Sequence, residues 1–130
     1  MTESEPFKLS LLYKQTLFSN IMRKLEREMN QAIRGQRNWA GSNTTVFTTD
    51  NGLESTVYLH GNHIATYFHY DRVLQLFDGG WQSVTTKSRL NALCDEFAPG
   101  HGVMQKNWTW FLIDRFTGLK IPFISGNSVK

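Results

Sequence analysis

The chain is poor in cysteine and proline, with one cysteine and three prolines among 130 residues. A single cysteine, Cys94, excludes a disulfide framework, and its place in an apolar helical pattern indicates a thiol buried in a reducing compartment. No apolar run is long enough to cross a bilayer or to act as a secretory signal. We therefore expect a cytoplasmic protein without a membrane anchor.

Catalytic motifs are also missing. The chain has no Gly-x-Ser-x-Gly elbow, no phosphate-binding Gly-x4-Gly-Lys-Ser/Thr loop, no His-Glu-x-x-His and no Cys-x-x-Cys pair. His60, His63 and His69 lie near Asp71, but no cysteine or well-spaced carboxylate completes a metal site, which favours surface or base-stacking imidazoles. We expect neither an enzyme nor a bound cofactor.

What the chain does contain is positive charge and aromatic rings. The formal net charge is +3, and aromatic residues make up 13% of the chain, with four tryptophans. A basic protein favours polyanionic partners, and the sign of the charge excludes a DNA mimic. The ring content exceeds what so small a core requires, which indicates that some rings face outward.

The length suits one domain over residues 1–130, with mobile ends at residues 1–7 and 125–130. Apolar residues at steps of three and four predict one long helix from about Lys8 to Arg34, which ends at Gly35. The apolar stripe is wide enough to serve the core, a second copy of the chain, or both. We therefore expect a homodimer or a higher oligomer.

Turn signals at Asn51-Gly52, Gly61-Asn62 and Asp71-Arg72 separate β-branched and aromatic segments, which predicts a four-stranded antiparallel meander. With two-residue loops at the first two turns, Val46 faces Val57 and Tyr58 faces Ala65. Alternation then predicts two faces. One is a core face of Val46, Val57, Leu59, Ile64, Phe68, Leu74 and Leu76, and the other is an aromatic face of Phe47, Tyr58, His60, His63, Tyr67, His69 and Phe77.

The second half of the chain predicts a helix that starts near Thr86 and stops before Pro99, followed by a hairpin that turns at Asn107. The predicted fold class is therefore α+β. It combines a long N-terminal helix, a twisted antiparallel sheet of about five to seven strands, and a second helix packed on that sheet.

The second helix opens with cations where acidic residues are normal. A helix N-terminus carries unpaired N–H groups and partial positive charge, so Lys87 and Arg89 fit poorly there unless an anion completes the site. The hydroxyls of Thr85, Thr86 and Ser88 and the two cations predict a phosphate site, with Trp81 upstream as a stacking surface. The alternative is that Thr85 or Thr86 is an ordinary N-cap and the cations are solvated.

Cations alternate with rings elsewhere along the chain, a pattern typical of proteins that bind single-stranded nucleic acid without reading a groove. The predicted nucleic-acid-binding residues are Lys87, Arg89, Arg72, Lys106, Arg37 and Thr86 for phosphates, and Trp81, Tyr67, Trp108 and Trp39 for bases. Two alternatives stay open: the rings are ordinary core, or the aromatic face of a small adaptor binds a protein partner.

Two segments carry a resemblance to known proteins. Thr56–Ala65 and Gly80–Leu93 resemble a small module of bacteriophage proteins. With its length, long N-terminal helix and basic charge, the chain also resembles the Drc family, single-stranded-DNA-binding RNA polymerase cofactors of phages that carry a virion RNA polymerase. The resemblance implies binding to melted promoter DNA and recruitment of a phage RNA polymerase, and it implies no individual site residues.

Overall fold

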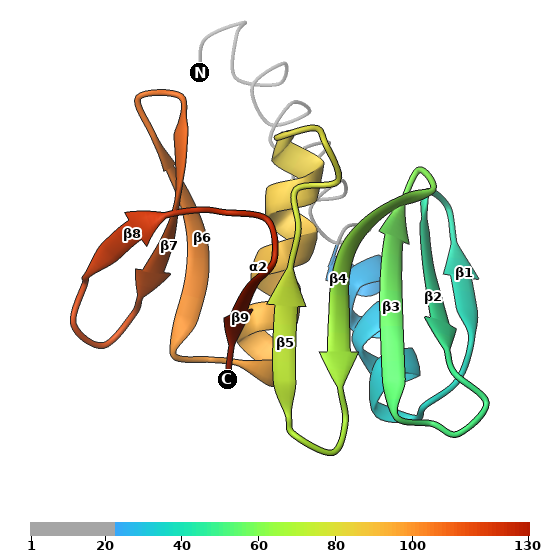
Figure 1. Cartoon of the computed structure of the whole chain (residues 1–130). Helices are drawn as coiled ribbons and strands as arrows, with labels where there is room; N and C mark the ends of the chain where they lie inside the picture. Colours follow the sequence, from blue (N-terminus) through green and yellow to red (C-terminus); the bar gives the residue numbers. More distant parts are fainter. Residues whose placement is uncertain (1–22) are drawn as a thin grey trace, which may run out of the picture.

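The computed structural model describes residues 23–130, which form two antiparallel sheets and two helices. The larger sheet has six strands in the order β1-β2-β3-β4-β5-β9, and the smaller has three in the order β6-β7-β8. The predicted α+β class is confirmed, but the strands form two sheets instead of one (Figure 1).

The first helix covers residues 23–34 of the described chain and buries Met29, Ala32 and Ile33 against the larger sheet. It ends where predicted. The amides of Gln36 and Arg37 donate to the carbonyls of Ile33 and Ala32, and Gln36 takes a left-handed φ of 53°. The predicted helix start at Lys8 and the mobile residues 1–7 lie outside the described residues.

The larger sheet is formed by β1 (Trp39–Gly41), β2 (Thr44–Thr48), β3 (Glu54–Leu59), β4 (Asn62–Phe68), β5 (Val73–Leu76) and β9 (Asn127–Val129). The predicted pairing of Val46 with Val57 is confirmed. Residues 125–130 are not simply a mobile tail, because β9 pairs with β5 and buries Val129.

The β3–β4 register differs from the prediction because a β-bulge lies between Val57 and Tyr58. Tyr58 pairs with His63 and Val57 with Ala65, whereas the sequence predicted Tyr58 opposite Ala65. A one-residue shift moves every later side chain to the other face of a strand. Tyr67, predicted on the aromatic face, therefore points into the core and is buried.

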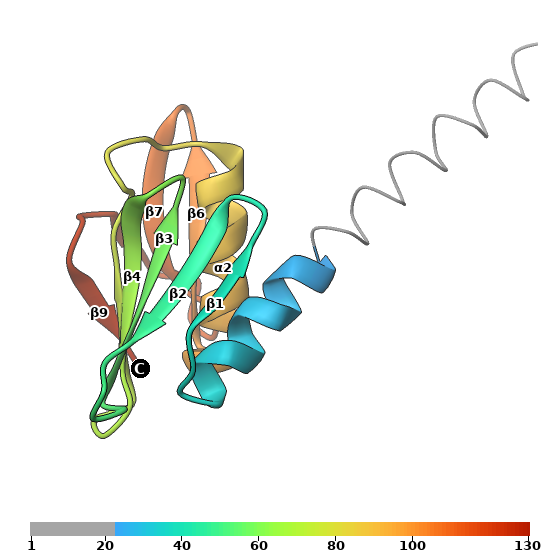
Figure 2. The same ribbon diagram turned by 90° about the vertical axis from the view of Figure 1, so that its right-hand side faces the viewer.

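Helix α2 (Val84–Phe97) and the first helix lie on the same face of the larger sheet, as Figures 1 and 2 show. Between them and the sheet lies the core, which includes Leu90, Leu93 and Cys94 from α2. No described element covers the opposite face over β2 and β3 (Figure 1). The side chains on that face of β2 and β3 therefore have no helix from the described residues packed on them.

The smaller sheet consists of β6 (His101–Lys106), β7 (Thr109–Asp114) and β8 (Lys120–Pro122). It is docked to α2 by Asn91, whose side-chain amide donates to the Val103 carbonyl and accepts from the Val103 amide, each at 2.9 Å. The side chain thus pairs with β6 as a neighbouring strand would. On the predicted hairpin, Trp110 and Leu112 are buried on one face of β7.

The edge strand β8 pairs with β7 through its odd-numbered residues. The Phe123 amide donates to the Trp110 carbonyl, and the Leu119 carbonyl accepts from the Asp114 amide. Because backbone groups alternate in direction along an antiparallel strand, those of Lys120 and Pro122 point away from β7. Pro122 has no amide hydrogen to offer on that outer edge.

Candidate nucleic-acid interface

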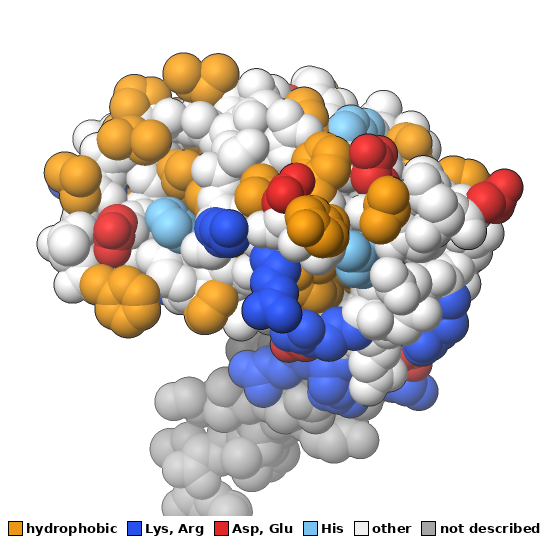
Figure 3. All heavy atoms as spheres, turned by 60° about the horizontal axis from the view of Figure 1, so that its bottom comes forward, with side chains coloured by type: hydrophobic (Ala, Val, Ile, Leu, Met, Phe, Trp, Pro, Cys, Tyr) orange, Lys and Arg blue, Asp and Glu red, His pale blue; other side chains and the backbone are white. Residues whose placement is uncertain are grey.

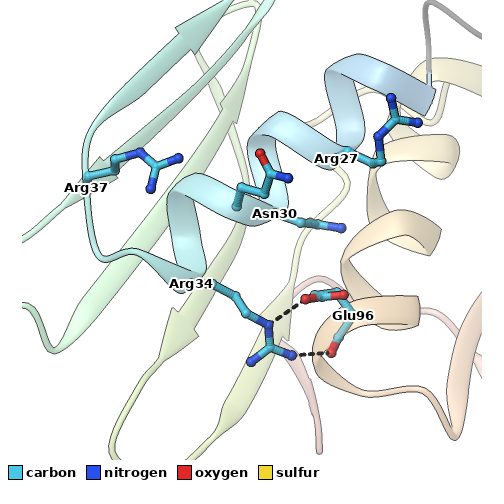
Figure 4. A pocket seen from close by; sticks show the side chains of 6 residues that line it. Arg27, Asn30, Arg34, Arg37 and Glu96 are labelled. Atoms are coloured by element: carbon cyan, nitrogen blue, oxygen red, sulfur yellow. Dashed lines mark hydrogen bonds and ion pairs between the residues drawn. The ribbon is translucent and has the colours of Figure 1, made fainter.

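Cations from separate segments meet at the C-terminal end of α2. Figure 3 shows Lys and Arg side chains gathered on one side of the molecule. Arg27 and Arg34 of the first helix, and Arg37 just after it, line a cavity of about 520 Å³ together with Asn30, Gln31 and Glu96 (Figure 4). A second cavity of about 460 Å³ shares Arg34 and Glu96 and adds Arg72 and Lys130. We call Arg27, Arg34, Arg37, Arg72 and Lys130 the arginine trough.

Glu96 of α2 is the carboxylate that lines both cavities of the trough. Arg34 pairs with it and also donates to its backbone carbonyl at 3.1 Å (Figure 4). The Arg34 guanidinium lies 5.0 Å from the ring centre of Phe97, a cation–π distance. Glu96 therefore orients one guanidinium, and the trough keeps an excess of positive charge.

The β4–β5 loop, which supplies Arg72 to the trough, also carries an exposed ring. Tyr70 is 89% exposed and precedes Arg72 by two residues. Arg72 itself takes a left-handed φ of 56°, a strained conformation for a side chain of this size. The same loop thus carries a flat exposed ring and a cation, the two kinds of side chain that bind single strands.

The opposite end of α2 differs from the prediction. The N-cap is Ser83, whose hydroxyl accepts from the Thr86 amide, and the first turn is Val84, Thr85 and Thr86. Thr86 is buried, with its hydroxyl bonded to the Trp81 carbonyl. Neither Lys87 nor Arg89 lies in the first turn, so the argument from misplaced cations at a helix N-terminus is wrong.

Arg89 is an internal residue and not a phosphate ligand. Its side chain is 1% exposed, and its guanidinium contacts Glu26 at 3.1 Å, Thr44 at 3.0 Å and Asn43 at 3.2 Å. Ser88 donates to the same Glu26 oxygen at 2.7 Å. This network joins α2, the first helix and the β1–β2 turn, and it occupies the side chain that the sequence assigned to DNA.

Two predicted base-stacking residues are engaged in packing. Tyr67 is buried, with its ring 4.4 Å from that of Phe97. Trp39 is partly buried against the core, and a Cβ at Gly41 would come within 2.4 Å of its ring. Neither ring is therefore the freely exposed stacking surface that the sequence predicts.

The remaining predicted residues gather at the start of α2. Lys87 donates to Gln105 at 3.4 Å, which places the start of α2 beside the β6–β7 turn. Trp81 is 74% exposed and Trp108 is 91% exposed, with Lys106 exposed next to the turn. We call Trp81, Lys87, Lys106 and Trp108 the tryptophan end. The predicted interface is therefore divided, because Arg37 and Arg72 lie at the other end of α2.

Trp108 occupies a turn that suits glycine. Asn107 and Trp108 have φ values of 52° and 66°, as in a type I′ hairpin turn, where Asn-Gly is favoured. Trp108→Gly is expected to raise the free energy of unfolding by about 1 kcal/mol, because glycine adopts this φ without strain and the exposed ring loses little contact. Urea unfolding measures the change, and a destabilised variant would show that the ring packs against the protein.

The sequence does not predict a role for Arg27, Arg34 or Lys130 at this surface. Periodicity places the two arginines in a long amphipathic helix, and Lys130 falls in the C-terminal segment that is predicted to be mobile. The available signal was their spacing, since Arg27 and Arg34 are seven residues apart and so lie on one helical face. Their partners Arg37, Arg72 and Lys130 come together only through the fold.

Other polar groups in the core fit structural roles. Ser55 lies between Thr48, at 2.7 Å, and His69, at 2.8 Å, but its side chain is fully buried and unreachable for a substrate. Burial lowers the pKa of His69 and raises the pKa of Cys94 to about 12, which keeps the thiol protonated. Within residues 23–130, no cluster of three His, Cys, Asp or Glu side chains could hold a metal ion.

The protein is thus a small basic α+β protein in which cations are concentrated near the C-terminal end of α2. Within the described part of the chain, no helix has the length and apolar character needed to span a bilayer. The chain belongs to the Kyanoviridae Gp96 protein family, whose sequence profile matches residues 22–130. The chain is thus a bacteriophage protein, as its resemblance to a small module of bacteriophage proteins implies. The family match does not support the resemblance to Drc. No curated protein and no solved structure matches the chain.

Proposed function

We propose that this phage protein binds single-stranded DNA without sequence preference, with the arginine trough as its phosphate-binding surface. The observation that carries the proposal is that Arg27, Arg34, Arg37, Arg72 and Lys130 line two cavities that share Arg34 and Glu96. Guanidinium groups bind phosphate oxygens through two parallel hydrogen bonds and also stack on bases. The exposed ring of Tyr70, in the same loop as Arg72, adds a stacking surface.

A single strand suits this surface better than a duplex. The trough is a hollow lined by the first helix, by Arg37 just after it and by Glu96 of α2, with Arg72 and Lys130 at the adjoining cavity. A flexible strand follows such a surface, whereas a duplex is too stiff to bend into it. The tryptophan end, with two exposed rings and two lysines, offers a further contact for the same strand.

The test is a fluorescence-anisotropy titration of labelled (dT)20 and of a hairpin duplex at several salt concentrations. We expect tighter binding of (dT)20 and a log–log salt slope of about −2 to −3.5, from three to five phosphates at roughly 0.7 each. Equal affinity for both DNAs would contradict the single-strand preference. A flat salt dependence would favour the alternative, an adaptor that binds a protein partner through an aromatic face.

From the resemblance to Drc alone, we further propose that the protein holds melted promoter DNA and recruits a phage RNA polymerase. Purification from infected cells with nuclease treatment tests it: loss of the polymerase after DNA removal would exclude a direct contact. Self-association through the first helix is also a prediction, and analytical ultracentrifugation of the full chain measures it.

A further inference from the structure

The uncovered face of the larger sheet carries rings on successive strands. Phe47 of β2 is 53% exposed, and Tyr58 of β3 is partly exposed. On the next strand, the His63 ring lies 5.9 Å from the Tyr58 ring and 4.2 Å from the Phe77 ring. Phe47 has no ring partner among the described residues, so a flat apolar surface stays available above it.

The surroundings of these rings are polar but mostly uncharged. By register, Thr45 and Thr56 lie on the same face as the rings, and so does the exposed carboxylate of Glu54 at the start of β3. Thr66 and Gln75 share this face, but Thr66 is buried and Gln75 donates to the Gly126 carbonyl. Hydroxyl and amide groups can donate to and accept from base edges, whereas phosphates need cations. This face therefore suits bases and not backbone phosphates.

The aromatic face and the arginine trough adjoin along the chain. Arg37 lines the trough, and the next two residues, Asn38 and Trp39, line an open cavity of about 680 Å³ at the sheet edge that also includes Phe47 and Tyr58. Asn38 is held there by the Thr48 amide, which donates to its side-chain oxygen at 2.8 Å. A polymer that leaves the trough at Arg37 thus meets the rings next.

We propose that the sheet face around Phe47 and Tyr58 is a base-stacking platform for the stretch of single strand that continues from the arginine trough past Arg37 and Trp39. The proposal rests on the proposed function and assigns successive stretches of the strand to two surfaces. Such a platform would favour single strands, because the paired bases of a duplex cannot reach a sheet face.

The experiment compares Phe47→Ala with wild type on (dT)20 and on the hairpin duplex, with the salt slope measured for each. We expect (dT)20 binding to fall about 5- to 150-fold, the usual range for one stacked base, with an unchanged slope because no phosphate contact is lost. Phe47→Trp should restore binding, and Phe47→Leu, which keeps apolar bulk without a flat ring, should not. Phe116→Ala is the matched control, since that exposed ring belongs to the β7–β8 connection.

The results of these titrations distinguish a failure of the base-stacking platform from a failure of the proposed DNA binding. If Phe47→Ala and Phe47→Leu bind (dT)20 as wild type does, while Arg27→Ala combined with Arg37→Ala binds it weakly, the platform is overturned and the function stands. That result would leave the sheet face to a protein partner. If wild type binds neither DNA, both proposals fail. Circular dichroism of each variant shows whether the fold is kept, which we expect because Phe47 is largely exposed.

Discussion

Arg89→Ala is expected to lower the free energy of unfolding by about 3–5 kcal/mol, the usual effect of removing one partner from a buried ion pair. The change leaves the Glu26 carboxylate, itself only 13% exposed, without its cation, leaves the Thr44 hydroxyl without its donor, and removes one of the two donors to the Asn43 side-chain oxygen. Urea unfolding followed by circular dichroism measures the loss. A change below about 1 kcal/mol would contradict the assignment of Arg89 as a structural residue.

Two further variants control for side-chain truncation and for charge. Lys87→Ala removes a partly exposed cation from the same helix and should change stability by less than about 0.5 kcal/mol. Arg89→Met with Glu26→Leu replaces the whole pair by apolar groups and should recover much of the lost stability, because no buried charge is left unpaired.

The second prediction with a large effect concerns the trough. Arg27→Ala combined with Arg37→Ala should weaken (dT)20 binding on the order of 100-fold, at roughly 1.5 kcal/mol for each charged contact. The salt slope should become shallower by about 1.4, since each phosphate contact on a single strand contributes roughly 0.7. Anisotropy titrations measure both quantities. Arg34 is left in place because it pairs with Glu96.

The matched control removes the same charge from the same helix. Arg23 and Lys24 are exposed and line neither cavity of the trough, so Arg23→Ala with Lys24→Ala should weaken binding only slightly. Equal weakening by the two double variants would show that overall charge, not the trough, attracts the strand.

The local parts of the fold could be predicted from the sequence. Apolar spacing predicted both helices, and the Asn51-Gly52 turn set the correct β2–β3 register. The β3–β4 register was wrong because a β-bulge has no reliable pattern in a single sequence, and this one error moved Tyr67 from the surface to the core. Short strands such as β1, β8 and β9 form through pairing with distant segments, so their own residues predict them poorly.

The candidate site was less predictable than the fold. Trp81, Lys106 and Trp108 were assigned to an exposed surface, and they are exposed. Arg89 looks like any surface arginine in a helix, because its burial depends on Glu26 and Asn43, each more than 40 residues away. For the same reason the trough, which joins the first helix to Lys130, follows from tertiary packing alone.

Pro122 limits how copies of this protein can associate. An open sheet edge with apolar neighbours such as Ile121 and Ile124 is a template on which identical chains could grow into a filament. The missing amide hydrogen interrupts any such ladder at its second outward position, and the Lys120 ammonium adds charge repulsion between stacked copies. The β8 edge of the smaller sheet is thus poorly suited to edge-to-edge pairing between copies of this protein.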